Sequence, residues 1–176
     1  MQVGETVLIH GCGGVGLFGI QLAKAAGAYV IVSSSPATVE LAKQLGAAKV
    51  INYKTDNFVD AVKKETNGAG VDIVCDFVGG DLIANSIPIM KPLGRMVSIV
   101  NVTGNLGAAY RSNLTLHFLF MLRARYKLNA LRGLIERGLV KPVIDSVMPL
   151  KDVALAHQKL EKGGIKGKIV LQVVPD

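Results

Sequence analysis

Short apolar segments alternate with helical segments along the first 120 residues, and this alternation constrains the fold more than any other feature. Strand segments are predicted at 6–10, 29–33, 49–53, 71–77 and 94–100. They are nearly all apolar and do not alternate with polar residues, which is typical of strands covered on both faces. Strict alternation of strands and helices predicts right-handed βαβ units. We therefore predict an α/β fold with a doubly wound, mostly parallel sheet.

The remaining elements complete a six-stranded sheet and add a tail. Helices are predicted at 14–27, 36–46 and 56–66, with a short one that ends before Pro88. Ser35 is placed to cap the second helix, with Pro36 in its first turn and Gly46 just past its end. The apolar segment 114–120 predicts a sixth strand, and a helix follows at 124–137. We predict a domain at 1–142 and a strand–helix–strand tail at 143–176.

A glycine motif lies directly between the first predicted strand and the first predicted helix. Gly11, Gly13 and Gly16 form G-x-G-x-x-G, which in this context is typical of dinucleotide binding. The first glycine makes a tight turn, the second lets a pyrophosphate approach, and the third lets the helix pack closely. The N–H groups of Gly14, Val15 and Gly16 are then expected to bind phosphate at the positive end of the helix dipole.

The end of the second strand carries hydroxyls where an NAD site usually carries a carboxylate. Ser33, Ser34 and Ser35 lie about 20 residues beyond the motif, and the first acid is Glu40, inside the predicted helix. A helix N-terminus with hydroxyls suits the 2′-phosphate of NADP. We therefore expect NADP in preference to NAD. Tyr53 is expected near the cofactor, with an ordinary solvated loop as the alternative.

Two further turns lie at carboxyl ends of predicted strands, where ligands bind in such sheets. Their backbone groups are candidates to hold a nicotinamide, and plain turn chemistry is the alternative. The residues are Phe77, Val78 and Gly79 after the fourth strand, and Val100, Asn101 and Val102 after the fifth.

Composition bears on the partners. The net charge is +7, and residues 111–141 contain seven Lys and Arg residues but a single acidic residue, Glu136. No nucleic-acid motif accompanies this stretch, so we interpret it as a solvated face rather than an RNA site. The longest apolar run is too short to span a bilayer. Two distant cysteines form no disulfide framework or metal pair, which favours a reducing compartment, the cytoplasm.

Several separated segments share the pattern of one family. The chain resembles the zinc-independent quinone oxidoreductases (zeta-crystallin-like) of the medium-chain dehydrogenase/reductase superfamily. The segments that carry this resemblance are, in order, GETVLIHGCGGVG, IQLAKAAGA, LAKQLGA, VINY, GVDIVCDFVGG, GRMVSIVNVTG and GGIKGKIVLQV. The resemblance implies a Rossmann domain of an NADPH-dependent reductase of quinones or enones, without zinc.

The resemblance also implies what this chain lacks and which residues bind. Relatives have an N-terminal GroES-like substrate domain, on which the tail packs; here that domain is expected to be absent, so that this chain alone turns over little. Thr38 occupies the position nearest to a lysine of many relatives, and Lys168 matches a frequent family residue. The implied binding residues are Gly13, Gly14 and Val15 for phosphate, Ser33 to Ser35 for the 2′-phosphate, Tyr53 for the adenosine side, and Val78 with 100–102 for the nicotinamide.

Two expectations concern assembly and chemistry. The resemblance implies a homodimer joined edge to edge through 114–120, and an apolar edge strand is otherwise prone to aggregation. No catalytic acid or base is evident, and the three histidines are isolated in the sequence. A non-catalytic nucleotide-sensing or interaction module with a Rossmann core is the alternative function.

Overall fold

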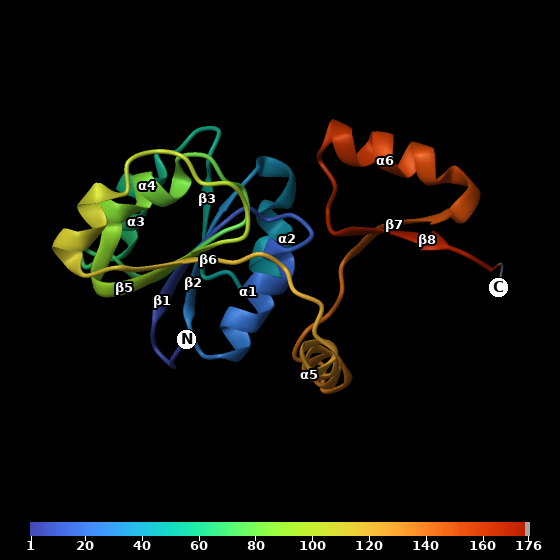
Figure 1. Cartoon of the computed structure of the whole chain (residues 1–176), viewed down its shortest axis with the longest axis horizontal. Helices are drawn as coiled ribbons and strands as arrows, with labels where there is room; N and C mark the ends of the chain where they lie inside the picture. Colours follow the sequence, from blue (N-terminus) through green and yellow to red (C-terminus); the bar gives the residue numbers. More distant parts are fainter. Residues whose placement is uncertain (175–176) are drawn as a thin grey trace.

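The computed structural model describes residues 1–174, in which six parallel strands form one twisted sheet (Figure 1). The strand order is β3-β2-β1-β4-β5-β6, so the order reverses between β1 and β4. The doubly wound α/β fold is therefore confirmed. The strands are β1 (Thr6–His10), β2 (Tyr29–Ser34), β3 (Lys49–Asn52), β4 (Val71–Asp76), β5 (Met90–Ser98) and β6 (Thr115–Phe118).

Polar residues meet in one register row at the carboxyl ends of the central strands. His10 of β1 pairs with Ser33 of β2 on one side and with Asp76 of β4 on the other. Asp76 in turn pairs with Ser98 of β5. All four side chains are buried. The apolar interior of the sheet thus ends in a polar edge, which is where ligands bind in open α/β sheets.

Helices cover both faces of the sheet and enclose two apolar cores. On one face, Val7 and Ile9 of β1 pack in a cluster with Leu17 and Ile20 of α1. On the other face, Leu8 packs in a cluster that holds residues of α3 and α4. Burial on both faces explains why the strands lack polar alternation. The helices are α1 (Gly16–Ala25), α2 (Val39–Gln44), α3 (Phe58–Glu65) and α4 (Leu82–Ser86).

Some boundaries differ from the predictions. The second helix begins as a 3₁₀ turn (Pro36–Thr38) before α2, and the Ser35 side chain makes no capping bond. The third helix begins two residues late, because Asn57 Oδ1 accepts the N–H groups of Val59 and Asp60 at 2.9 and 3.3 Å. Strand β5 begins four residues early, and an irregular register opposite β4 accommodates its exposed Pro92.

Strand β6 is shorter than the predicted 114–120 and leaves one edge of the sheet open. Leu114 and Leu116 pack against the core, as expected of one strand face. Phe118 and Phe120, which continue the same alternation in the segment 114–120, are 62% and 90% exposed. The strand ends at Phe118, so Phe120 lies beyond the pleat that orients the earlier side chains.

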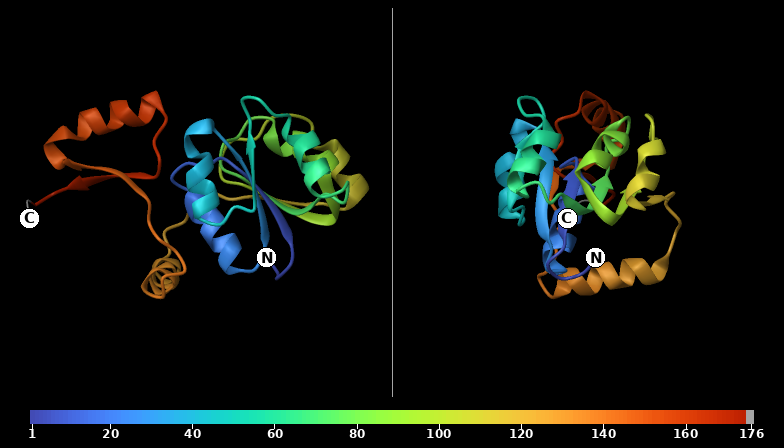
Figure 2. Two further views of the ribbon diagram at one scale, coloured as in Figure 1. Left: turned by 180° about the vertical axis from the view of Figure 1, so that it is seen from behind. Right: turned by 90° about the vertical axis from the view of Figure 1, so that its left-hand side faces the viewer.

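The last third of the chain stands apart from the sheet (Figure 2). Helix α5 (Arg125–Glu136) leads to β7 (Ile144–Pro149), α6 (Val153–Lys162) and β8 (Lys168–Gln172), and β7 and β8 form a separate parallel pair. The predicted tail extends to 176, and residues 175–176 lie outside the described residues. Within residues 1–174 no helix is both long and apolar enough to cross a membrane.

Candidate functional site

The three motif glycines have three different steric environments. Gly11 has φ +95°, and a Cβ there would lie 2.8 Å from Cγ2 of Val78. A Cβ on Gly16 would collide with the carbonyl oxygen of Gly11. Gly13 has no heavy atom within 4 Å of where its Cβ would be. The first and third glycines are thus required by the fold, whereas the second leaves open space beside the loop.

Free N–H groups and one cation surround that loop. In residues 1–174, no backbone or side-chain acceptor takes the N–H groups of Gly14, Val15 or Gly16. A Cβ on Gly14 would lie 2.9 Å from Nζ of Lys168, on the tail. Within the described part of the chain no carboxylate lies within 4.0 Å of this ammonium group. These are the features of an anion site at a helix N-terminus.

A cleft of about 1030 Å³ opens beside the loop, at the carboxyl ends of the strands. Its walls come from the ends of β1, β2 and β4, from the loop after β3, from α4, and from the tail loop between α6 and β8. The predicted residues that it brings together are Gly11, Gly13, Ser33, Ser35, Thr38, Tyr53, Val78 and Gly79.

The hydroxyl side chains at the end of β2 and in the loop after it divide into two sets. Ser34 is buried and lies outside the cleft lining, because its Oγ donates to the Ser35 carbonyl at 2.8 Å and lies 3.0 Å from Oγ1 of Thr38. Ser33, Ser35 and Thr38 line the cleft. Ser34 therefore supports the loop rather than facing a ligand.

Other predicted residues lie beside the cleft rather than in its wall. The Phe77 ring packs against the core beneath helix α1. It lies so close to the helix that a Cβ on Gly19 would be 2.9 Å from it. Val102 packs against the other core. Gly14 and Val15 line a second hollow of about 460 Å³ together with Gly167 and Lys168. Val100 and Asn101 are outside both linings and are tied to the turn after β4.

Several residues that line the cleft have no signal in a sequence pattern. They come from the start of α3, from α4 and from the tail, and only the tertiary fold brings them to the glycine loop. Among them are Asp56, Asn57, Phe58, Leu82, Asn85 and Ile165. Asn57 alone could have been found, since Asn is a favoured helix cap.

A neutral histidine lies directly beneath this edge. His10 is fully buried, its Nε2 lies 2.9 Å from Oγ of Ser86, and its ring meets the ring of Phe58 edge to face at 4.8 Å. Burial lowers the pKa of His10 to about 4, outweighing the attraction of Asp76. Nδ1 of His10 has no hydrogen-bond partner in the described part of the chain.

The two thiols are not poised for chemistry. Cys12 lines the cleft and is buried, and burial raises its pKa. Burial also raises the pKa of Cys75, to about 11. Both remain protonated thiols near neutral pH. Within residues 1–174 no group of three or more His, Cys, Asp or Glu side chains lies close enough to hold a metal ion.

The fold and site together define a Rossmann domain that binds a nucleotide cofactor. Residues 45–171 match the family model described as zinc-binding dehydrogenase. The chain belongs to this family, and it comprises the cofactor-binding part of the medium-chain dehydrogenase/reductase superfamily. The resemblance to quinone oxidoreductases is confirmed by the relatives described next.

Three relatives illustrate the similarity. The quinone oxidoreductase of Pseudomonas aeruginosa is 36% identical over 187 residues, covering 97% of this chain and 57% of the relative. That of Rattus norvegicus is 30% identical, covering 97% and 55%. The solved structure of Escherichia coli quinone oxidoreductase complexed with NADPH has a TM-score of 0.85 at 33% identity, covering 97% and 58%. The chain thus spans little more than half the length of these relatives.

Proposed function

We propose that the cleft binds NADP(H), with the diphosphate at the glycine loop. The observation that carries this proposal is the group of three free N–H donors at Gly14, Val15 and Gly16, beside open space at Gly13 and the ammonium of Lys168. Free amides at a helix N-terminus, beside a cation that has no carboxylate partner in residues 1–174, favour a diphosphate over a neutral ligand. The Escherichia coli structural relative, which was solved in complex with NADPH, supports the same cofactor.

The preference for NADP over NAD rests on the groups near β2. Ser33, Ser35 and Thr38 line the cleft there, and the Thr38 hydroxyl is hydrogen-bonded to Ser34 and to the Ser35 carbonyl. Glu40 is outside the cleft lining and forms an exposed ion pair with Lys43 at 2.8 Å, so it does not take the place of the carboxylate that binds the ribose of NAD. Tyr53, 56% exposed, is proposed to cover the adenosine side from the loop after β3.

The whole enzyme is proposed to reduce a quinone or an enone. The nicotinamide supplies a hydride when it is bound. In this chain the glycine loop binds the diphosphate, and the turns after β4 and β5 orient the nicotinamide. We propose that the substrate contacts belong to a GroES-like domain outside 1–142, and that the tail, 143–176, packs on that domain. The domain alone is therefore expected to bind cofactor and to turn over little.

The assembly is proposed to be a homodimer that pairs the open edge of β6. Among the described residues, β6 pairs with β5 on one side and with no strand on the other. The side chains of Phe118, Leu119 and Phe120 are at least 49% exposed. Pairing across a two-fold axis would satisfy the free edge and cover these side chains. The two unpaired cysteines are consistent with the cytoplasm.

Calorimetric titration with NADPH and NADH tests the cofactor. We expect NADPH to bind at least about tenfold more tightly than NADH. Ser35→Asp should reverse the preference, because a carboxylate repels the 2′-phosphate and accepts from the 2′-hydroxyl. Ser112→Asp, outside the cleft, is the matched control and should change neither affinity. Failure of both coenzymes to bind at millimolar concentration would overturn the proposal.

A further inference from the structure

A network of hydrogen bonds through the buried side chains of Asp76 and Ser98 joins the turns after β4 and β5. Oδ1 of Asp76 accepts the N–H groups of Val78 and Gly79, both at 2.9 Å. Oδ2 of Asp76 accepts the hydroxyl of Ser98 at 2.8 Å. The Ser98 oxygen in turn lies 3.4 Å from the N–H of Val100. The amide of Val78, in the cleft wall, is thus linked through two side chains to the amide of Val100.

Asp76, at the centre of this network, has no counter-ion in residues 1–174. Asp76 is 0% exposed, and in the described part of the chain no Lys or Arg nitrogen lies within 4.0 Å of it. Its neighbour His10 is neutral. A buried carboxylate is costly unless hydrogen bonds satisfy it. In residues 1–174 its donors are two N–H groups of the turn after β4 and the hydroxyl of Ser98 at the end of β5, so these bonds hold the first turn directly and reach the second turn through Ser98.

Backbone hydrogen bonds couple the position of the turn after β5 to that of the turn after β4. The N–H of Gly80 donates to the Asn101 carbonyl at 3.1 Å, and the N–H of Thr103 donates to the Gly80 carbonyl at 2.9 Å. Gly79 has φ +97°, and a Cβ there would lie 2.8 Å from the Asn101 carbonyl oxygen. The two turns therefore approach as closely as their backbones allow, and they form one unit.

We propose that Asp76 and Ser98 are positioning residues for the nicotinamide half of the cofactor. The inference rests on the proposed function. The adenosine side of the cleft lies at β2 and β3, with Ser35 and Tyr53. In the strand order, β4 and β5 lie on the other side of the glycine loop. A dinucleotide with its diphosphate at that loop extends its nicotinamide toward the turns that Asp76 and Ser98 hold.

Comparing a whole cofactor with half of it tests this inference. Adenosine 2′,5′-bisphosphate carries the adenosine and 2′-phosphate groups but no nicotinamide. We expect Ser98→Ala to lower the affinity for NADPH by about fivefold or more, while the affinity for the bisphosphate stays within about twofold of the wild-type value. Ser98→Thr, which keeps the hydroxyl, should retain NADPH affinity. Ser98→Cys, whose thiol is a much weaker hydrogen-bond donor and acceptor in a side chain of similar shape, should show the same selective loss if Ser98→Ala fails to fold.

Ser86→Ala is the matched control, because Ser86 is another fully buried serine whose hydroxyl is hydrogen-bonded, to His10 and to the Leu82 carbonyl. It should lower the melting temperature without changing the ratio of the two affinities. Equal weakening of both ligands by Ser98→Ala, or no weakening of either, would overturn the positioning role. Failure of the wild-type chain to bind either ligand would instead overturn the proposed function, and the positioning role with it.

Discussion

The side-chain amide of Gln21 binds both backbone groups of Lys141. Nε2 of Gln21 donates to the Lys141 carbonyl at 3.0 Å, and the Lys141 N–H donates to Oε1 at 2.7 Å. Gln21 is 6% exposed on helix α1, and 120 residues separate the two in sequence. This contact holds the segment that leads into the tail against helix α1, two residues before the tail begins.

Gln21→Met should loosen the tail. The substitution keeps the side-chain volume but removes the bonds to Lys141, leaving its backbone groups unpaired, which costs about 2 kcal/mol of unfolding free energy. Hydrogen exchange should become faster in β7 and β8, while the protection of β1 and β4 persists. Gln44→Met, at an exposed position of α2, is the control. Unchanged exchange in the tail would show that other contacts hold it.

Alanine at two motif glycines should separate folding from binding. Gly16→Ala forces a Cβ into the Gly11 carbonyl, so we expect a loss of about 3 kcal/mol of unfolding free energy, measured by urea titration. Gly13→Ala meets no atom within 4 Å and should fold with a change of at most about 0.5 kcal/mol. The Gly13→Ala variant should nevertheless bind NADPH at least about tenfold more weakly, because the new methyl group fills the space proposed for the diphosphate. Unchanged NADPH affinity in Gly13→Ala would contradict this placement.

Local patterns predicted the framework of the site well. The glycine motif could be placed because its steric demands are set by a strand, a tight turn and a helix within a few residues. The first four strands end within a residue of their predicted ends because both of their faces are buried. Strand β5 was harder to place, since its irregular register around Pro92 depends on its pairing with β4.

Contacts between distant segments could not be predicted. Nothing near Gln21 in the sequence indicates a partner at Lys141. Phe77 follows a strand like a ligand-binding residue, but the absence of a side chain at Gly19 lets its ring pack under α1. Asp76 was missed because a carboxylate that ends a strand has the same local pattern whether it faces solvent or caps two amides. These are properties of packing, not of spacing.

The buried His10 predicts a stability that falls in mild acid. Its pKa is lowered from 6.5 to about 4 in the folded chain. Above pH 6.5 the ring is neutral in both states, so this contribution is fully present. As the pH falls from 6.5 to 4, the unfolded chain takes up a proton that the folded chain excludes, and the unfolding free energy should fall by about 3 kcal/mol.

Urea titrations at several pH values measure this effect. His10→Gln should flatten the dependence between pH 6.5 and 4, even if the variant is less stable throughout. His117→Gln, at an exposed position of β6, should keep the wild-type slope. A slope in His10→Gln equal to that of the wild-type chain would assign the effect to other groups.

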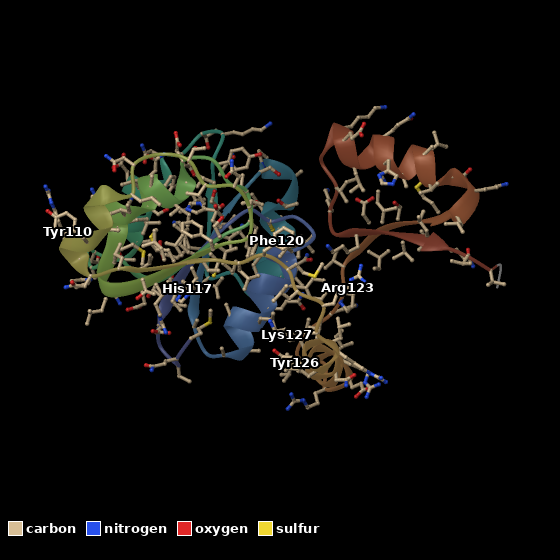
Figure 3. The ribbon with its side chains drawn as sticks, in the orientation of Figure 1. Tyr110, His117, Phe120, Arg123, Tyr126 and Lys127 are labelled. Atoms are coloured by element: carbon tan, nitrogen blue, oxygen red, sulfur yellow. The ribbon has the colours of Figure 1, made fainter. Side chains whose placement is uncertain are left out.

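The open edge of β6 predicts a concentration-dependent dimer. Phe120 lies in the segment that joins β6 to α5, whereas Tyr110 lies at the far end of the core (Figure 3). Phe120 and Tyr110 are 90% and 73% exposed. Phe120→Glu removes the apolar ring that the dimer would bury. It also places a negative charge in each copy of the two-fold interface, and these charges repel each other. Sedimentation equilibrium should show a dimer for the wild-type chain and for Tyr110→Glu, and a monomer for Phe120→Glu. Raising the protein concentration 100-fold above that used for the titrations favours association by roughly 2.7 kcal/mol. A wild-type chain that is still monomeric at that concentration would exclude this edge as a stable interface.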